Sequence, residues 1–158
     1  MRLFELANDV LIISMKNYEV KTEIQISAPP SKVWSALINF NHWKDWNPTV
    51  SAASGEAAVG SVLSFTMQCE GPRNGSKYSP TVTEIKKDNS LRWHAKMGFN
   101  LLFANEKVFE LNNSGSGTLL VHKEVFSGLI PALFWSKMSP GIPPMLEMMN
   151  LALKKKVE

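Results

Sequence analysis

The first clear pattern in the chain is an alternation of apolar and polar side chains between residues 18 and 27. Every second position from Val20 to Ile26 carries an apolar side chain or a threonine, and the positions between them are charged or amide residues. A period of two is typical of a strand with one buried face. Pro29 and Pro30 follow, and a helix is predicted to begin there because its apolar residues form one stripe: Val33, Trp34, Leu37 and Ile38.

A second short helix is predicted in the segment FNHWKDWNP, residues 40–48. Pro48 ends it, because the residue before a proline disfavours the helical conformation. Trp43 and Trp46 lie three residues apart and therefore share one side of a helical turn. His42 and Lys44 are then expected to face water.

Six further alternating runs are separated by clusters of glycine, serine, asparagine and aspartate, and they predict an antiparallel meander. The runs cover residues 50–53, 62–69, 78–86, 91–98, 102–111 and 118–126. Four prolines interrupt the next segment, GLIPALFWSKMSPGIPP at 128–144, which is predicted to be a loop with at most a short helical turn. A terminal helix from about Pro143 to Lys156 is predicted from the spacing of Met145, Met148, Met149 and Ala152.

The length of 158 residues suits one domain with a single core, and 44% hydrophobic with 20% charged residues is ordinary for a folded protein. We expect residues 1–17 to form an N-terminal extension, a candidate for flexibility, and residues 18–158 to form the domain. The first residues lack the cleavage site of a signal peptide, and no run reaches the roughly 18 apolar residues of a membrane span. We therefore expect no integral membrane association.

The net charge of +3 argues against nucleic acid as a partner, because the only basic run, Lys154 to Lys156, suits a helix C-terminus. Cys69 is the single cysteine, so no intrachain disulfide can form and a reducing cytoplasm is expected. The sequence leaves the oligomeric state open.

No motif for a cofactor or metal is present. The chain lacks a GxSxG elbow, a P-loop and a dinucleotide-binding GxGxxG, and its three histidines (His42, His94 and His122) are scattered without HExxH or CxxC. We predict neither a cofactor nor a metal ion. Cys69 has no partners for nucleophilic catalysis and suits a small buried apolar residue.

Several segments occur together in an order that resembles one known family. They are ISAPPSKVWSALINFNHWKDWNP, SPTVTEI, LRWHAKM, GTLLVHKEVFSG and MNLALKKKVE. This set is similar to the polyketide cyclase/dehydrase-like branch of the SRPBCC, or START-like, superfamily over roughly residues 18–158. The resemblance implies an α+β helix-grip fold: a curved seven-stranded antiparallel sheet around a long C-terminal helix, two short helices after strand one, and a hydrophobic cavity between sheet and helix.

The sequence also departs from the pattern of this family. Family members often carry a histidine two residues before a phenylalanine in the sixth strand, whereas here Lys107 precedes Phe109. This difference weakens any transfer of the family's polar-site chemistry to this chain. The proline-rich segment before the last helix also suggests a differently shaped cavity mouth.

For two strands, the predicted site depends on which face of the strand points into the cavity. In the strand at 91–98, periodicity turns Leu91, Trp93, Ala95 and Met97 inward. In the strand at 118–126 both faces contain apolar residues, so periodicity cannot choose. The resemblance favours His122, Glu124 and Phe126 on the cavity side, beside Lys107 and Phe109 of the neighbouring strand.

The predicted ligand contacts are therefore Trp46, Met67, Trp93, Met97, Lys107, Phe109, His122, Glu124, Phe126, Met145 and Met149. Methionines suit irregular apolar walls, and a few polar groups commonly orient a ligand in such a pocket. We expect one of Trp43 and Trp46 to pack in the core and the other to close one end of the cavity, and we assign Trp46 to the cavity end. A purely structural Lys107–Glu124 ion pair remains an alternative, and His122 and Glu124 are weak catalytic candidates.

Three functions remain open. The first, which we favour, is binding of a small hydrophobic molecule such as a lipid, isoprenoid or polyketide-like compound. The second is a polyketide cyclase or dehydratase that uses Glu124 or His122. The third is a protein-interaction module, for which GLIPALFW is the only candidate patch.

Overall fold

The computed structural model describes residues 18–98 and 101–158, so the predicted extension at 1–17 lies outside the described residues. The elements follow in the order β1 (Tyr18–Ile26), α2 (Pro30–Ile38), η1 (Phe40–Asp45), β2 (Val50–Ser54), β3 (Ser64–Met67), β4 (Lys77–Tyr78), β5 (Thr81–Lys86), β6 (Ser90–Met97), β7 (Phe103–Ser114), β8 (Gly117–Ser127), α3 (Leu129–Met138), η2 (Ser139–Gly141) and α4 (Ile142–Val157). This order confirms the predicted succession of strand, two short helices, strands and terminal helix.

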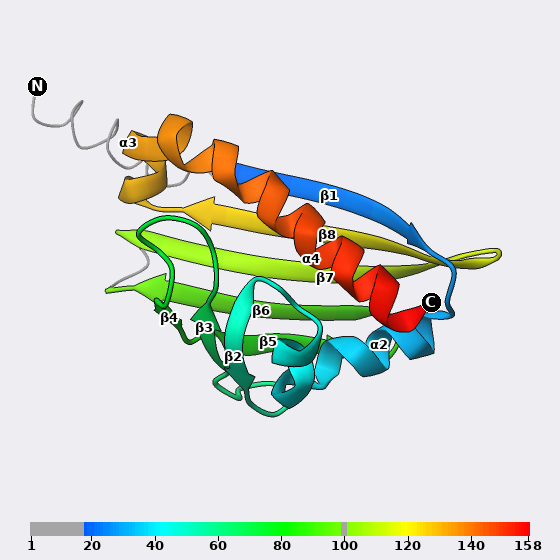
Figure 1. Cartoon of the computed structure of the whole chain (residues 1–158). Helices are drawn as coiled ribbons and strands as arrows, with labels where there is room; N and C mark the ends of the chain where they lie inside the picture. Colours follow the sequence, from blue (N-terminus) through cyan, green and yellow to red (C-terminus); the bar gives the residue numbers. More distant parts are fainter. Residues whose placement is uncertain (1–17, 99–100) are drawn as a thin grey trace, which may run out of the picture.

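Two antiparallel sheets form the frame of the molecule. The larger has the order β1-β8-β7-β6-β5 and the smaller has the order β2-β3-β4. A bridge between Val62 and Thr81 connects them. α4 runs diagonally across one face of the larger sheet, whose strands are long and twisted (Figure 1). The predicted α+β helix-grip fold is thereby confirmed.

The number of strands differs from the prediction at one place. The run at 78–86 is divided into β4 and β5 around Pro80. Proline has no N–H to donate to a ladder, while its carbonyl still accepts a hydrogen bond from the Leu63 amide at 2.8 Å. The chain therefore leaves the smaller sheet and enters the larger one at this proline.

The terminal helix begins near Pro143 as predicted, but α3 lies where the sequence predicts a loop with at most a short helical turn, and that prediction is wrong. Pro131 lies in the first turn of α3, Pro140 in η2, and Pro143 and Pro144 in the first turn of α4. Amides in a first helical turn have no partner within the helix, so proline costs nothing there. The preceding Gly128 has φ of +104°, and a Cβ at this position would lie 2.7 Å from the Leu102 carbonyl oxygen.

α3 is apolar on its outer side as well as its inner one. Pro131 is buried and the Trp135 ring packs on Tyr18, whereas Leu129, Leu133 and Phe134 are exposed. These exposed residues belong to the segment GLIPALFW, which the sequence marks as a candidate interaction patch. Within the described ranges, none of the helices combines the length and the apolar character needed to cross a bilayer.

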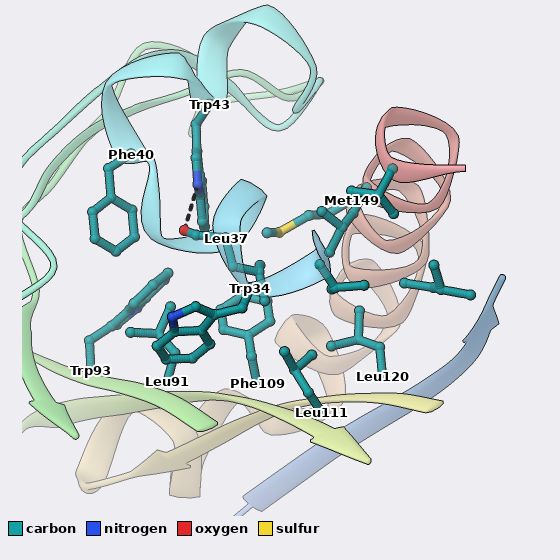
Figure 2. Packing of buried hydrophobic residues seen from close by; sticks show 14 of the residues in the cluster. Trp34, Leu37, Phe40, Trp43, Leu91, Trp93, Phe109, Leu111, Leu120 and Met149 are labelled. Carbon is teal, nitrogen blue, oxygen red and sulfur yellow. Dashed lines mark hydrogen bonds between the residues drawn. The ribbon is translucent and has the colours of Figure 1, made fainter. Parts of the chain in front are cut away.

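The principal core lies between α2, η1, α4 and the larger sheet. Trp43 is at its centre and donates a hydrogen bond from Nε1 to the Leu37 carbonyl oxygen at 3.0 Å (Figure 2). Its ring packs within 5.3–6.4 Å of the rings of Phe40, Trp46, Phe65, Trp93 and Phe109. Met149 projects from α4 toward this cluster (Figure 2). His42 and Lys44 are exposed, as expected, and His42 Nδ1 lies 3.0 Å from Asp45 Oδ2.

Candidate ligand-binding cavity

A cavity of about 180 Å³ lies among the larger sheet, β3, β4 and α4. Six aromatic side chains line it: Trp43, Phe65, Tyr78, Trp93, Phe103 and Phe126. Met67 of β3 and Met145 and Met149 of α4 add flexible apolar surface. The wall is therefore mainly apolar and rich in flat rings.

Strand periodicity places three polar residues on this wall. Asn105 and Lys107 are two positions apart on β7 and so share a face, and the register pairs them with Phe126 and Glu124 of β8. Trp93 of β6 is opposite Lys107 on the other side. The cavity residues of three adjacent strands thus form one continuous surface.

The strongest charged contact at the cavity is an ion pair. Lys107 Nζ lies 2.6 Å from Glu124 Oε1, and the two side chains are only 12% and 7% exposed. A buried charge is stable only when it is paired, and each of these ions satisfies the other. Because both residues line the cavity, a ligand would meet a cation and an anion side by side.

Tyr78 and Asn105 form a second polar contact, which sequence reasoning missed. The Tyr78 hydroxyl donates to Asn105 Oδ1 at 2.7 Å. Burial, and secondly the nearby Glu124 carboxylate, raise the pKa of Tyr78 far above its usual value, against an opposing effect of the Trp93 indole N–H. The phenol is therefore neutral at physiological pH. Asn105 could have been found, because it precedes Lys107 by two positions on the same strand.

Two buried donors at the cavity lack a partner among the described residues. They are Asn105 Nδ2 and Trp93 Nε1. The Trp93 N–H lies close enough to influence the Tyr78 hydroxyl but does not reach hydrogen-bond geometry with it. Both atoms are shielded from solvent, and a buried donor without an acceptor is costly.

His122 lies off the cavity wall. It is fully buried, its ring stacks on Phe109 with centroids 4.3 Å apart, and its Nδ1 lies 2.8 Å from Asn150 Oδ1 on α4. Asn150 Nδ2 donates to Thr22 Oγ1, whose own proton goes to the His122 carbonyl oxygen. The Asn150 oxygen therefore accepts, and Nδ1 of His122 carries the proton. This network ties α4 to β1 and β8.

The buried state of His122 predicts a dependence of stability on pH. Burial, reinforced by Lys107, lowers its pKa well below 6.5, while the bond to Asn150 acts in the opposite direction. As the pH falls below 6.5, the histidine of the unfolded chain binds a proton, whereas His122 in the folded protein stays neutral. Stability should therefore fall below about pH 6.5, by at most about 1.4 kcal/mol per pH unit for one proton.

Denaturant unfolding of the wild type and His122→Gln between pH 5 and 8 measures this effect. Gln retains a donor for Asn150, and the variant should lose the slope that His122 contributes. His94→Gln, on the opposite face of β6 from Trp93, is the matched control and should keep the slope. Equal slopes in wild type and His122→Gln would exclude His122 as the source.

Four predicted contacts do not line the cavity. Phe109 and His122 are buried behind the wall, in the core. Met97 is 59% exposed because it is the last residue of β6, next to the turn at Gly98. Trp46 is partly buried against Trp43, and Trp43 lines the cavity in its place. The structure brings the other seven together: Met67, Trp93, Lys107, Glu124, Phe126, Met145 and Met149.

The cavity borders a larger hollow of about 700 Å³ at the protein surface. Both are lined by Thr49, Cys69, Arg73 and Met145, so the two adjoin at these four residues, and we call this junction the passage. The outer hollow lies between the segment after β3 and the start of α4, with Met148 on its wall. The proline-rich segment thus shapes the mouth of the cavity through Gly141 and Pro144.

Metal-binding side chains are not gathered at this site. In the part of the chain that the structure describes, no three His, Cys, Asp or Glu residues are placed to hold a metal ion. Cys69 is a free thiol at the passage. Tyr78, Asn105, Lys107 and Glu124 supply polar groups to the cavity, and Thr49, Arg73, Ser76 and Lys77 also line it.

A model of the family described as polyketide cyclase / dehydrase and lipid transport matches residues 18–158. No curated protein sequence matches the chain significantly. The fold is similar to that of norcoclaurine synthase from Thalictrum flavum, in complex with dopamine and hydroxybenzaldehyde, with a TM-score of 0.71, 15% identity, and coverage of 92% of this chain and 88% of that one.

Two further structures share the fold. The protein TTHA0849 from Thermus thermophilus has a TM-score of 0.72 and 18% identity, covering 89% of this chain and 97% of that one. The di-domain ARO/CYC StfQ of the steffimycin biosynthetic pathway has a TM-score of 0.66 and 15% identity, covering 89% of this chain and 50% of that one. At such identities the likeness concerns the fold alone.

Proposed function

Because the chain belongs to the polyketide cyclase/dehydrase and lipid transport family over residues 18–158, we propose that its cavity binds a small hydrophobic molecule of the lipid, isoprenoid or polyketide-like class. The ligand lies between the larger sheet and α4, against the six aromatic rings. Its polar part meets Lys107 and Glu124. We place the ligand's route to solvent at the passage beside Met145, because Met145 lines both hollows.

The observation that carries this proposal is the composition of the cavity wall. Apolar walls with a few convergent polar groups are typical of small-molecule sites. A core without a ligand function would gain stability by filling 180 Å³ with side chains. A buried ion pair contributes little stability by comparison, so its position on the wall favours a role in orienting a ligand.

Mass spectrometry of gently purified protein tests the proposal directly. We expect extracts to contain one enriched hydrophobic compound that is absent from a mock purification. Protein carrying Met145→Trp, in which the passage is obstructed, should yield much less of it. Equal amounts from both proteins would show that the compound does not occupy this cavity.

A cyclase or dehydratase activity is the second candidate. It is favoured by the cation, carboxylate and phenol that Lys107, Glu124 and Tyr78 place around one cavity, because a proton donor and acceptor could then act on a bound chain. His122 does not line the cavity, so Glu124 takes the role of base in this candidate. Glu124→Gln should reduce turnover by about 100-fold or more if the protein is such an enzyme.

A further inference from the structure

β1 is an edge strand of the larger sheet, and only part of its edge is covered. It pairs with β8 on one side and, within the described residues, with no strand on the other. Two side chains of α4 cover the end of this edge. Lys154 Nζ donates to the Gln25 carbonyl oxygen at 2.6 Å, and the Ser27 amide donates to Glu158 Oε1 at 2.7 Å. An uncovered edge presents N–H and C=O groups to which another strand can bond.

The two contacts with α4 show which residues direct their backbone away from β8. In an antiparallel ladder, successive residues point their N–H and C=O groups alternately to the two sides. Gln25 and Ser27 bond on the outer side, so Glu19, Lys21 and Glu23 have their backbone groups on that side too. In the described part of the chain, no side chain bonds to the backbone of these three residues.

The side chains along this edge are complementary to themselves. Lys21 and Glu23 are exposed on one face of β1, with Lys21 Nζ 2.7 Å from Glu23 Oε1. If two copies of β1 pair antiparallel about a two-fold axis at Thr22, Lys21 of each copy lies opposite Glu23 of the other. Each such pair can exchange two backbone hydrogen bonds and join opposite charges. On the other face, Val20 lies opposite Ile24, and both are only half-buried in the single chain.

Other registers fit less well. An axis at Lys21 would place this lysine opposite its own copy and Glu19 opposite Glu23, so like charges would face each other. An axis at Glu23 would pair that carboxylate with itself. Thr22 is also the middle residue of β1, so an axis there pairs the strand over its whole length.

α4 leaves room for a second strand. Asn150 donates from Nδ2 to Thr22 Oγ1 while its Oδ1 meets the His122 ring, so α4 lies above the boundary between β1 and β8 at this point. β1 forms the border of the sheet beside it (Figure 1). With strands about 4.8 Å apart, the two α4 helices would be about 10 Å apart at the axis, which is an ordinary distance for packed helices.

We propose that β1 is the interface of a homodimer, in which two copies pair antiparallel about Thr22 and join their larger sheets into one. The proposal is independent of the ligand in the cavity. Charged residues on an edge strand discourage indiscriminate pairing, and the alternation of sign restricts it to a partner with the opposite pattern. The contact is small, so we expect a dissociation constant in the micromolar range.

Two single charge reversals test the proposal in the full chain. Lys21→Glu and Glu23→Lys each place like charges opposite one another in both pairs of a homodimer. Sedimentation velocity over a concentration series should show a monomer–dimer equilibrium for the wild type and a dimer about 10-fold or more weaker for each variant alone. An equimolar mixture of the two variants should regain the wild-type affinity, because only the mixed dimer places opposite charges across both pairs. Native mass spectrometry with one variant ¹⁵N-labelled identifies this mixed dimer.

Lys96→Glu is the matched control, since it changes the net charge equally at an exposed position near the end of β6. It should dimerise as the wild type does. Regained affinity in the mixture also shows that both variants are folded. A wild type that stays monomeric throughout the series would overturn the proposal. A wild-type dimer that neither reversal weakens, or a mixture no tighter than its components, would exclude this edge and register.

Discussion

Met145→Trp should prevent a hydrophobic ligand from entering the cavity. Met145 lies on the wall of both the cavity and the outer hollow, so a bulkier indole at this position would occupy the passage. Extra atoms in space that the ligand would use cost about 1–3 kcal/mol, which predicts about a 5- to 150-fold loss of affinity. Isothermal titration with acetophenone, a one-ring apolar probe of a size that suits a cavity of about 180 Å³, measures the loss.

Met148→Trp is the matched control. Met148 is exposed, three positions along the same helix, and lines only the outer hollow. This variant should bind acetophenone as the wild type does. Met149→Trp should also block uptake, but Met149 is fully part of the core and its replacement would disturb the fold too. Unchanged affinity in Met145→Trp would mean that the ligand enters or lies elsewhere.

The sequence predicts the fold well because the signals are local and repeated. Alternation along β1 and β6 and the spacing of the methionines in α4 each indicate one element. The prediction at α3 is wrong because a proline suits the first turn of a helix but disrupts its interior. Pro131 would break a helix in its middle, but it begins one here, and position within a helix is known only once the helix is known.

The site was less predictable because it depends on contacts between distant segments. Both faces of β8 carry apolar residues, so no period in the sequence could choose the inward face. His122 and Glu124 share that inward face, and only the packing of α4 places His122 against Asn150 and leaves Glu124 at the cavity. Trp43 lies in η1 and Trp46 directly follows its last residue, and only packing decides that Trp43 lines the cavity. Tyr78 carries no sequence signal at all, since its partner Asn105 is 27 positions away.

Lys107→Met should destabilise the folded protein by about 3 kcal/mol at pH 7. The substitution keeps an unbranched side chain one atom shorter than lysine but leaves the Glu124 carboxylate in a site where it is only 7% exposed. Breaking a buried ion pair on one side typically costs about 3–5 kcal/mol, and the lower end is expected because the pair faces a cavity. Denaturant unfolding measures the change, with His94→Gln as a control that alters neither ion.

The double variant Lys107→Met/Glu124→Leu separates stability from function. Removing both charges should restore the free energy of unfolding to within about 1 kcal/mol of the wild type, because the desolvation of two ions is avoided. A double variant as unstable as Lys107→Met would show that apolar residues do not replace the pair. If stability returns while ligand orientation or turnover is lost, the pair is retained for its chemistry, since the fold does not require it.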